Sequence, residues 1–526
     1  MIIYSVRPAV AVGICFLAAL LILVLGNKIR ENFREAITIG VAVISAAIVL
    51  SMVPGAINGV WCEIQLWQIA EGIGFAFRAD AAAMVFAIIA SCLWILTSFY
   101  SSGYVRGHHE RNQTGYFAAF AACIGSALGI AMAANLITFF IFYEMLTIAT
   151  YPLVVHYRDE KARRSGRKYL IYTLVSGQFF FAAIVCVYAF CGTGDFKAGG
   201  FLSEVYAEGG LQGGMGTVLV LFLMMIGGGA VKAGVMPLHG WLPSAMVAPT
   251  PVSALLHAVA VVKAGAFCVL RVVCYVFGPE LAAACGGAKL LSWLAVGTIV
   301  LSSMIAMQKD NLKARLAFST VGQLSYIVLG ISLLSVYSIS GALFHMTAHA
   351  TLKITLFMAV GAIFVTTGKS EISQMKGLVR QMPVTAVCFA AASLGIAGLP
   401  LMAGFVSKFN MMKGAVLMGK PFIALVYAAA ALLAVAYLMP VVQIFFRKEI
   451  AGEGIEAITK DAKETAKAIA EDAEAVHEVS RKHALAMGIP MVMTLLLAVI
   501  LGTAPNFGPH LYQMAQVAAE AVMKGG

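Results

Sequence analysis

Residues 338–364 read SISGALFHMTAHATLKITLFMAVGAIF, an apolar run that carries His345, His349 and Lys353 at intervals of four. On a helix, this spacing puts the three side chains on one face within about two turns. An ionisable residue at membrane depth is costly and usually faces a bundle interior or a wet cavity. The stretch therefore predicts a membrane-spanning helix that carries part of a functional site.

The composition extends this prediction to the whole chain. Hydrophobic residues make up 61% of the sequence and charged residues 12%, whereas soluble domains carry about 25% charged residues. We count about fourteen apolar segments that could each span a membrane with about 20 residues. Because alternating strand patterns are absent, the sequence predicts an all-α polytopic membrane protein and not a β-barrel.

The net charge of +11 indicates membrane topology. Basic residues gather in short loops between the predicted spans, and such loops remain in the cytoplasm. Nothing in them resembles a nucleic-acid-binding motif, so no nucleic-acid partner is expected. The alternation predicts a multi-pass protein of a prokaryotic cell membrane with both termini outside. The basic loops are residues 26–35, 102–113, 156–168, 308–316, 368–381 and 445–449.

Two predicted spans contain helix breakers next to a lysine. Gly234 and Pro237 follow Lys232, and Gly398 and Pro400 precede Lys408. A helix interrupted at membrane depth frees backbone groups that need a cavity or polar neighbours, and paired interruptions indicate a transport site between repeats. Pro249 and Pro251 are expected to shape the start of the following helix.

Glu144 is the carboxylate of its predicted span, and Lys232 is its natural partner. Such a pair is either a static contact between helices or a site where a moving partner loads and releases a proton. His257 and Lys263 are six residues apart, which separates them by about 120° on a straight helix. With the histidines, which titrate near pH 6.5, these residues predict a proton pathway: Glu144, Lys232, His257, Lys263, His345, His349, Lys353 and Lys408.

The ten cysteines do not form a CxxC pair, so iron–sulfur and zinc sites are not expected. They are interpreted as small apolar packing residues. The expectation is therefore a chain without a metal or cofactor of its own.

Several motifs resemble one membrane protein family. Residues 231–265, VKAGVMPLHGWLPSAMVAPTPVSALLHAVAVVKAG, are similar to the antiporter-like subunits of respiratory complex I. The family includes the large subunits of Mrp-type sodium/proton antiporters and the membrane arms of energy-converting hydrogenases and formate hydrogenlyase. The other matching motifs are FFIFYEMLTIATYPLV, LKARLAFSTVGQLSYI, ALFHMTAHATLKITLFMAVG and GIAGLPLMAGFVSKF.

The resemblance implies about fourteen transmembrane helices, arranged as two inverted five-helix repeats with two broken helices. It places Glu144 and Lys232 on the family's Glu–Lys pair, and Lys263 on a central lysine. His257 falls on the histidine after the first broken helix. The remaining family positions form the relay of the second half: His345, His349, Lys353 and Lys408.

The expected organisation has five parts. A charged, alanine-rich helix at the cytoplasmic side is expected after the core, either as a connection or as a docking element. The parts are residues 1–114 (N-terminal helices), 115–415 (antiporter core), 416–448 (a span), 449–483 (the charged helix) and 484–526 (the last span and tail).

The functional hypotheses remain open. The first is a proton-translocating subunit of a multisubunit Mrp-type cation/proton antiporter, favoured because His257 and Lys263 occur together. The alternative is a proton-pumping subunit of a complex I-like oxidoreductase, hydrogenase or formate hydrogenlyase with a peripheral redox module. A stand-alone transporter is the third. Expected partners are other membrane subunits, protons and, for the antiporter, sodium.

Overall fold

The computed structural model describes residues 1–70, 72–108, 110–210, 214–447 and 485–525, without the side chains of residues 256 and 257. The expected charged helix at 449–483 therefore lies outside the described residues. Twelve helices of the described part are long and apolar enough to cross a membrane. Two further segments consist of shorter consecutive helices, 250–277 and 383–417. They raise the number to the predicted value of about fourteen spans.

The first half of the chain consists of α1 (Arg7–Leu25), α2 (Glu31–Leu50), α3 (Val53–Ile57), α4 (Ala81–Gly107), α5 (Gln113–Met132), α6 (Leu136–Val154), α7 (Glu160–Cys191), α8 (Phe201–Ala207), α9 (Gly214–Ala233), α10 (Trp241–Ser244), η1 (Ala245–Val247), α11 (Thr250–Ala258), α12 (Val261–Arg271) and the π-helix η2 (Val272–Phe277).

The second half consists of α13 (Pro279–Ala284), α14 (Gly287–Gln308), α15 (Leu312–Ser332), α16 (Val336–Thr367), η3 (Ile372–Gln374), α17 (Leu378–Gln381), α18 (Pro383–Ala397), α19 (Ala403–Leu417), α20 (Pro421–Phe446), a further span Leu485–Thr503, and α22 (Leu511–Lys524).

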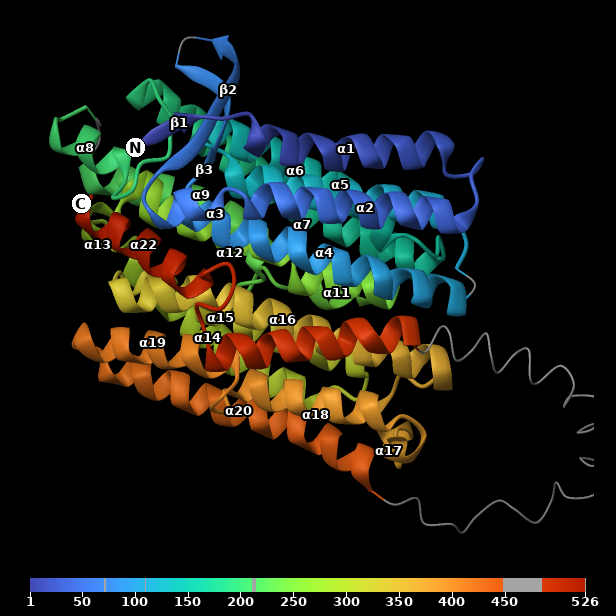
Figure 1. Cartoon of the computed structure of the whole chain (residues 1–526). Coiled ribbons are helices and arrows are strands. Elements are labelled where there is room, and N and C mark those ends of the chain that lie inside the picture. Colours follow the sequence, from blue (N-terminus) through green and yellow to red (C-terminus); the bar gives the residue numbers. More distant parts are fainter. Residues whose placement is uncertain (71, 109, 211–213, 448–484, 526) are drawn as a thin grey trace, which may run out of the picture.

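The spans lie side by side and their direction alternates, so the loops fall at two ends (Figure 1). The described parts of the six basic loops lie at one end, which we call the basic end. Both termini lie at the other end, which we call the hairpin end. The alternation expected from the loop charges is therefore present in the fold.

A small sheet at the hairpin end was not expected from the sequence. β1 (Ile2–Tyr4) pairs in parallel with β2 (Trp61–Ala70), which pairs antiparallel with β3 (Ile73–Ala79). The sheet is tied to α6, since Asn135 Nδ2 donates to the Gly74 carbonyl over 2.8 Å. Its strands are short and lie outside the spans, so span-length hydropathy does not indicate them.

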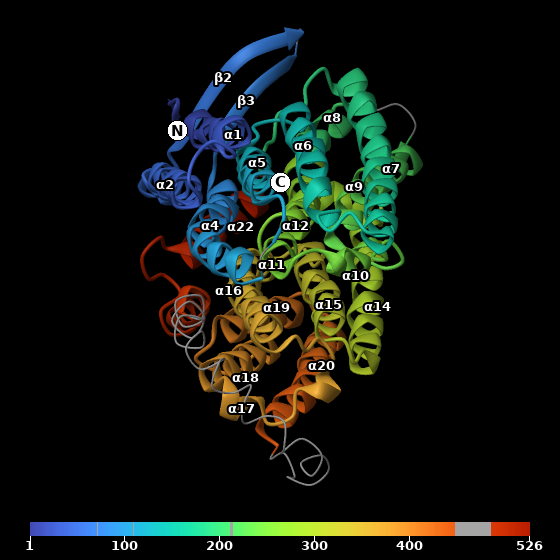
Figure 2. The same ribbon diagram turned by 90° about the vertical axis from the view of Figure 1, so that its right-hand side faces the viewer.

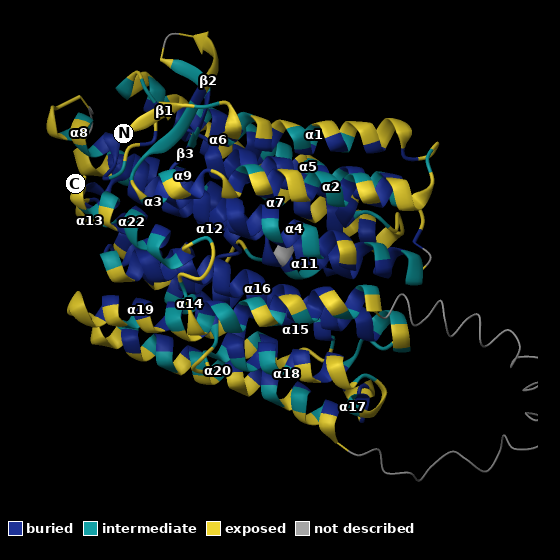
Figure 3. Ribbon diagram, in the orientation of Figure 1, coloured by how far each residue is buried: buried dark blue, intermediate teal, exposed yellow. Residues whose placement is uncertain are grey.

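Two groups of helices, one from each half of the chain, meet at α16 (Figure 2). This helix contacts α4 and α11 of the first half and α15, α18 and α19 of the second. Its central residues are buried, whereas the outer helices expose apolar side chains on their outward faces (Figure 3). That distribution suits a bundle surrounded by lipid, because apolar side chains remain favourable there.

Candidate functional site

The first broken helix presents Lys232 at its open end. α9 ends at Ala233, and Gly234 follows with φ 72°, a conformation that favours glycine. Lys232 Nζ lies 3.4 Å from the centroid of the Tyr143 ring and donates to the Tyr143 carbonyl on α6. The ammonium therefore makes a cation–π contact with Tyr143. Lys232 also lies in the last turn of α9, where the helix dipole favours a positive charge.

Glu144 follows Tyr143 on α6 and points its carboxylate towards α7. A Cβ placed on Gly177 would overlap Glu144 Oε1, so the glycine makes room for the carboxylate. Both carboxylate oxygens are buried and lack a hydrogen-bond partner among the described residues. Glu144 and Lys232 interact electrostatically, but no hydrogen bond joins them in the described structure.

A direct contact between ionisable side chains joins the two halves. Lys263 Nζ on α12 lies 2.6 Å from His349 Nδ1 on α16. Both side chains are fully buried. The helix that carries Lys263 is interrupted at Val259 and Ala260, between α11 and α12, so the 120° relation expected for a straight helix does not apply. His257 lies on α11, and its side chain is outside the described residues.

The ionisable residues of α16 have different partners although they share a face. Lys353 Nζ turns to α15, where it donates to Ser319 Oγ over 2.7 Å and to the Leu316 carbonyl over 3.1 Å. His345 Nδ1 lies 2.8 Å from Ser407 Oγ on α19. The α16 row therefore connects α12, α15 and α19.

The second broken helix repeats the arrangement around Lys232. α18 ends at Ala397, Gly398 adopts φ 103°, and α19 begins at Ala403. Lys408 Nζ donates to the Ile396 carbonyl over 2.6 Å and lies 4.8 Å from the Tyr326 ring centroid. In each half, the lysine of the broken helix thus lies over a tyrosine ring and donates to a backbone carbonyl. For Lys232 this carbonyl lies within α6, and for Lys408 it lies in the last turn of α18.

The predicted positions Gly234 and Gly398 lie at these interruptions, as do Pro237 and Pro400. Pro249 and Pro251 flank the first residue of α11, as expected for a helix start. The sequence reasoning missed Tyr143 and Tyr326, whose rings hold the two lysines. In the sequence, the two tyrosines were indicated only by their place in two of the motifs that resemble the antiporter-like family.

A second buried charge pair was also missed. Arg271 of α12 donates to Asp80, with 2.6 Å between Arg271 Nη1 and Asp80 Oδ2. The guanidinium carbon lies 4.4–5.0 Å from the ring centroids of Tyr275, Phe196 and Phe267. Asp80 also caps α4, because its Oδ1 accepts from the Ala83 amide over 2.7 Å. Among the described residues, no group of three His, Cys, Asp or Glu side chains could hold a metal ion.

Membrane-spanning helices, two interruptions beside lysines and a buried row of ionisable side chains define a polytopic membrane protein with an ionisable axis. The sequence matches the family described as NADH:quinone oxidoreductase/Mrp antiporter, TM, over residues 133–434. The chain belongs to this family, and the resemblance found in its motifs is confirmed.

Curated relatives come from both branches of the family. The chain is 34% identical over 343 residues to a probable K(+)/H(+) antiporter A/B subunit of Rhizobium meliloti (strain 1021), and the match covers 65% of this chain and 33% of the relative. It is 31% identical to the A subunit of a Na(+)/H(+) antiporter of Alkalihalophilus pseudofirmus, with 65% and 43% covered. It is 27% identical to the N subunit of NADH-quinone oxidoreductase of Desulforudis audaxviator, with 74% and 76% covered. The chain thus spans less than half of each of these two antiporter relatives.

Solved structures share the fold. A chain of the Mrp complex from Dietzia sp. DQ12-45-1b matches with a TM-score of 0.81 and 20% identity over 99% of this chain and 98% of that chain. A chain of respiratory complex I from Thermus thermophilus matches with a TM-score of 0.76 and 21% identity over 98% and 99%. The fold is therefore the antiporter-like one, with two inverted five-helix repeats and two broken helices.

Proposed function

We propose that this chain is a proton-translocating subunit of a multisubunit Mrp-type monovalent cation/proton antiporter. The observation that carries the proposal is the 2.6 Å contact between Lys263 and His349, which joins the ionisable groups of both halves. The similarity to two antiporter subunits of the A type supports the cation/proton pairing and, with it, partner subunits in the membrane.

The proposed route uses electrostatic coupling between neighbours. A proton on Lys232 is stabilised or released according to the charge of Glu144, which is not hydrogen-bonded to it and can therefore act by a small movement. The proton passes by way of His257 and Lys263 to His349, and the other α16 groups, Lys353 and His345, connect it to Lys408. Each transfer changes the proton affinity of the next group because the groups are close and buried.

In this proposal the basic end faces the cytoplasm, so both termini lie on the outer side of the cell membrane. The support is the excess of Lys and Arg in the six loops of that end. No redox centre is assigned to the chain itself.

One observation supports a second candidate function. The chain matches the N subunit of an NADH-quinone oxidoreductase over 76% of that protein, so a proton-pumping subunit of a complex I-like oxidoreductase or a membrane-bound hydrogenase is the alternative. The deciding experiment is native purification in mild detergent with mass spectrometry of the partners. Small membrane proteins without redox centres support the antiporter, and iron–sulfur, flavin or nickel–iron subunits support the alternative. A homo-oligomer alone contradicts both and supports a stand-alone transporter.

The route is tested with Lys232→Ala and Glu144→Ala. Both variants are expected to abolish proton transport by the native complex while they still assemble. Thr173→Val is the matched control, since this buried hydroxyl on α7 bonds only to the Tyr169 carbonyl of its own helix among the described residues. Transport at the wild-type rate in either alanine variant contradicts the proposed route.

A further inference from the structure

A second cluster of titratable side chains lies at the basic end, outside the row already described. Glu110 follows α4, and its side chain is only 4% exposed. Its Oε1 accepts from Tyr157 over 2.7 Å and lies 3.1 Å from His108 Nδ1. Its Oε2 lies 3.3 Å from His156 Nε2. The carboxylate therefore has three ring partners from two different loops.

The cluster has one edge in contact with solvent and one edge inside the bundle. The His108 side chain is 36% exposed, whereas that of His156 is 4% exposed. Lys313 interacts electrostatically with Glu110 and donates to the Ala248 carbonyl over 3.1 Å. Lys313 also lines a pocket of the basic end together with Ser244 and Glu371.

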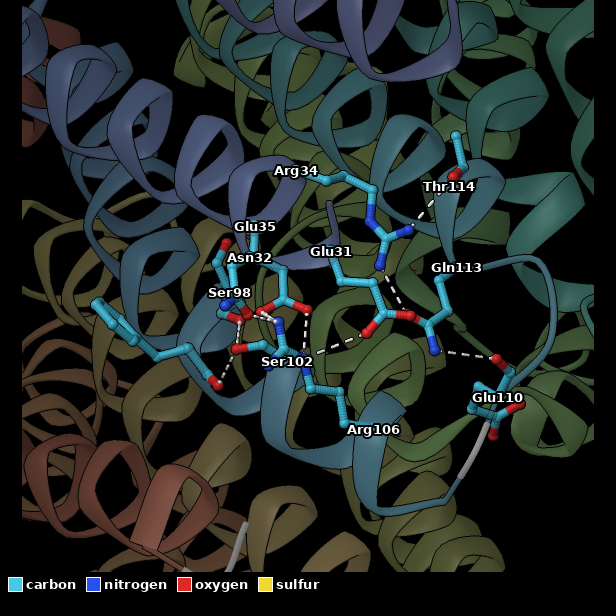
Figure 4. A network of polar contacts seen from close by, with 11 residues as sticks. Glu31, Asn32, Arg34, Glu35, Ser98, Ser102, Arg106, Glu110, Gln113 and Thr114 are labelled. Atoms are coloured by element: carbon cyan, nitrogen blue, oxygen red, sulfur yellow. Dashed lines mark hydrogen bonds and ion pairs between the residues drawn. The ribbon is translucent and has the colours of Figure 1, made fainter. Parts of the chain in front are cut away.

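The cluster is fixed in place by the surrounding helices. Gln113 Nε2 donates to the Glu110 carbonyl over 3.3 Å, and Gln113 Oε1 accepts from Arg34 Nη2 over 2.6 Å. Figure 4 shows these residues in a network that ties α2, α4 and α5 together at the basic end. The backbone at Glu110 is therefore held by contacts that involve three spans.

A line of hydroxyl groups leads from this cluster into the bundle. The Tyr157 hydroxyl interacts with that of Tyr104 on α4, and Thr250 Oγ1 donates to the Tyr104 hydroxyl over 3.5 Å. Ser253 lies three residues further along α11, is fully buried, and its Oγ has no hydrogen-bond partner in the described structure. Residues 250, 253 and 257 share one face of α11 by their spacing.

The line points towards Lys263. From Thr250, the 13 positions to Lys263 correspond to about 20 Å along a helix, about two thirds of the thickness of the hydrocarbon core. α11 (Thr250–Ala258), which forms the first part of this path, packs against α16. At Gly361 of α16, an added Cβ would overlap the Tyr100 hydroxyl and lie 3.0 Å from Thr250 Cγ2, so the glycine lets α4, α11 and α16 come together here.

We infer that Glu110, with His108 and His156, is a proton-uptake site at the basic end, and that Tyr157, Tyr104, Thr250 and Ser253 conduct the proton towards Lys263 and His349. A histidine nitrogen takes a proton from water, the proton moves to the Glu110 carboxylate, and each hydroxyl accepts one proton as it releases another. No electron or further reactant is needed. This uptake site rests on the proposed function.

The cluster suits this role because several charged and hydrogen-bonding groups face Glu110. Burial raises the pKa of Glu110, but the bonds from His156 and Tyr157 and the nearby imidazoles outweigh burial and leave it below the usual range. The carboxylate is therefore ionised at neutral pH and attracts a proton to the neighbouring histidines. Lys313 is the ammonium group that faces it from α15.

The test measures proton transport by the native complex in everted membrane vesicles, which expose the basic end to the outer buffer. Glu110→Gln and Thr250→Val are each expected to lower the rate by about tenfold or more, as for the loss of a positioned proton carrier. The Glu110→Gln variant also shifts the dependence of the rate on the outer pH, whereas its dependence on the lumenal pH stays as in the wild type.

Lys232→Ala separates this inference from the proposed function, and Thr173→Val is the control for a lost hydroxyl. If Lys232→Ala abolishes transport but both new variants transport at the wild-type rate, the uptake site is wrong and the proposed function remains. If Lys232→Ala transports protons at the wild-type rate, the proposed function is wrong, and the uptake site that rests on it is overturned with it. A Glu110→Gln variant that loses only thermal stability, with an unchanged outer pH profile, shows a structural role and overturns the inference.

Discussion

The buried Arg271–Asp80 pair gives a prediction whose size follows from its surroundings. Arg271 is 1% exposed and Asp80 5% exposed, so bulk solvent screens their charges little. The variant Arg271→Met keeps an unbranched apolar stem, which is shorter than that of arginine, but removes the charge. It leaves the Asp80 carboxylate buried without the Arg271 cation. Removing one partner of a buried pair costs about 3–5 kcal/mol, since the remaining charge is uncompensated.

The three aromatic rings around the guanidinium add to this cost, because a desolvated cation–π contact contributes about 2 kcal/mol or more. The matched variant is Asp80→Asn, which preserves a side-chain oxygen for the cap of α4 and removes the charge. In the double variant no unpaired charge remains. We therefore expect the double variant to be more stable than the sum of the single effects predicts, by about 0.5–3 kcal/mol.

The assay is unfolding of the purified chain in mixed micelles by titration with dodecyl sulfate, followed by circular dichroism. The expected result is a lowered free energy of unfolding for Arg271→Met and a clear positive coupling in the double variant. A loss below about 1 kcal/mol, the size of an exposed ion pair, together with strictly additive effects, would refute the reasoning.

Three further predictions concern glycines and pH. Gly265→Ala places a Cβ into the backbone of α9 and should cost about 1–3 kcal/mol of stability, whereas Gly297→Ala, with nothing within 4 Å, should not destabilise; equal thermal unfolding of the two variants contradicts this. Gly177→Ala pushes the Glu144 carboxylate, which the new Cβ would overlap, and should lower proton transport with little change in melting temperature; an unchanged rate counts against a role for that carboxylate position. The pKa of Glu110 is lowered in the folded chain, so its contribution to stability is complete above the unfolded pKa of about 4.3 and is lost as the pH falls through the folded value. The melting temperatures of wild type and Glu110→Gln should therefore converge in acid, and a difference that stays constant with pH contradicts this.

The sequence was sufficient for features that a membrane imposes on a local segment. A span must be about 20 residues long and apolar, so the number of spans could be counted from the sequence. A buried charge at membrane depth is rare, so Lys232, Lys353 and Lys408 could be selected without a structure. The interruptions after Lys232 and before Lys408 were indicated by Gly234 and Gly398, because these residues supply the left-handed backbone that ends α9 and α18.

Only the tertiary structure decided which groups meet. Lys263 and His349 are 86 residues apart, and Arg271 and Asp80 are 191 residues apart. Local spacing carries no information on such contacts, because they depend on how helices pack across the bundle. The same packing places Glu144 next to Gly177 and without a hydrogen bond to Lys232. The sequence by itself therefore determined the lysines and histidines at membrane depth, and the packing of distant helices determined their partners.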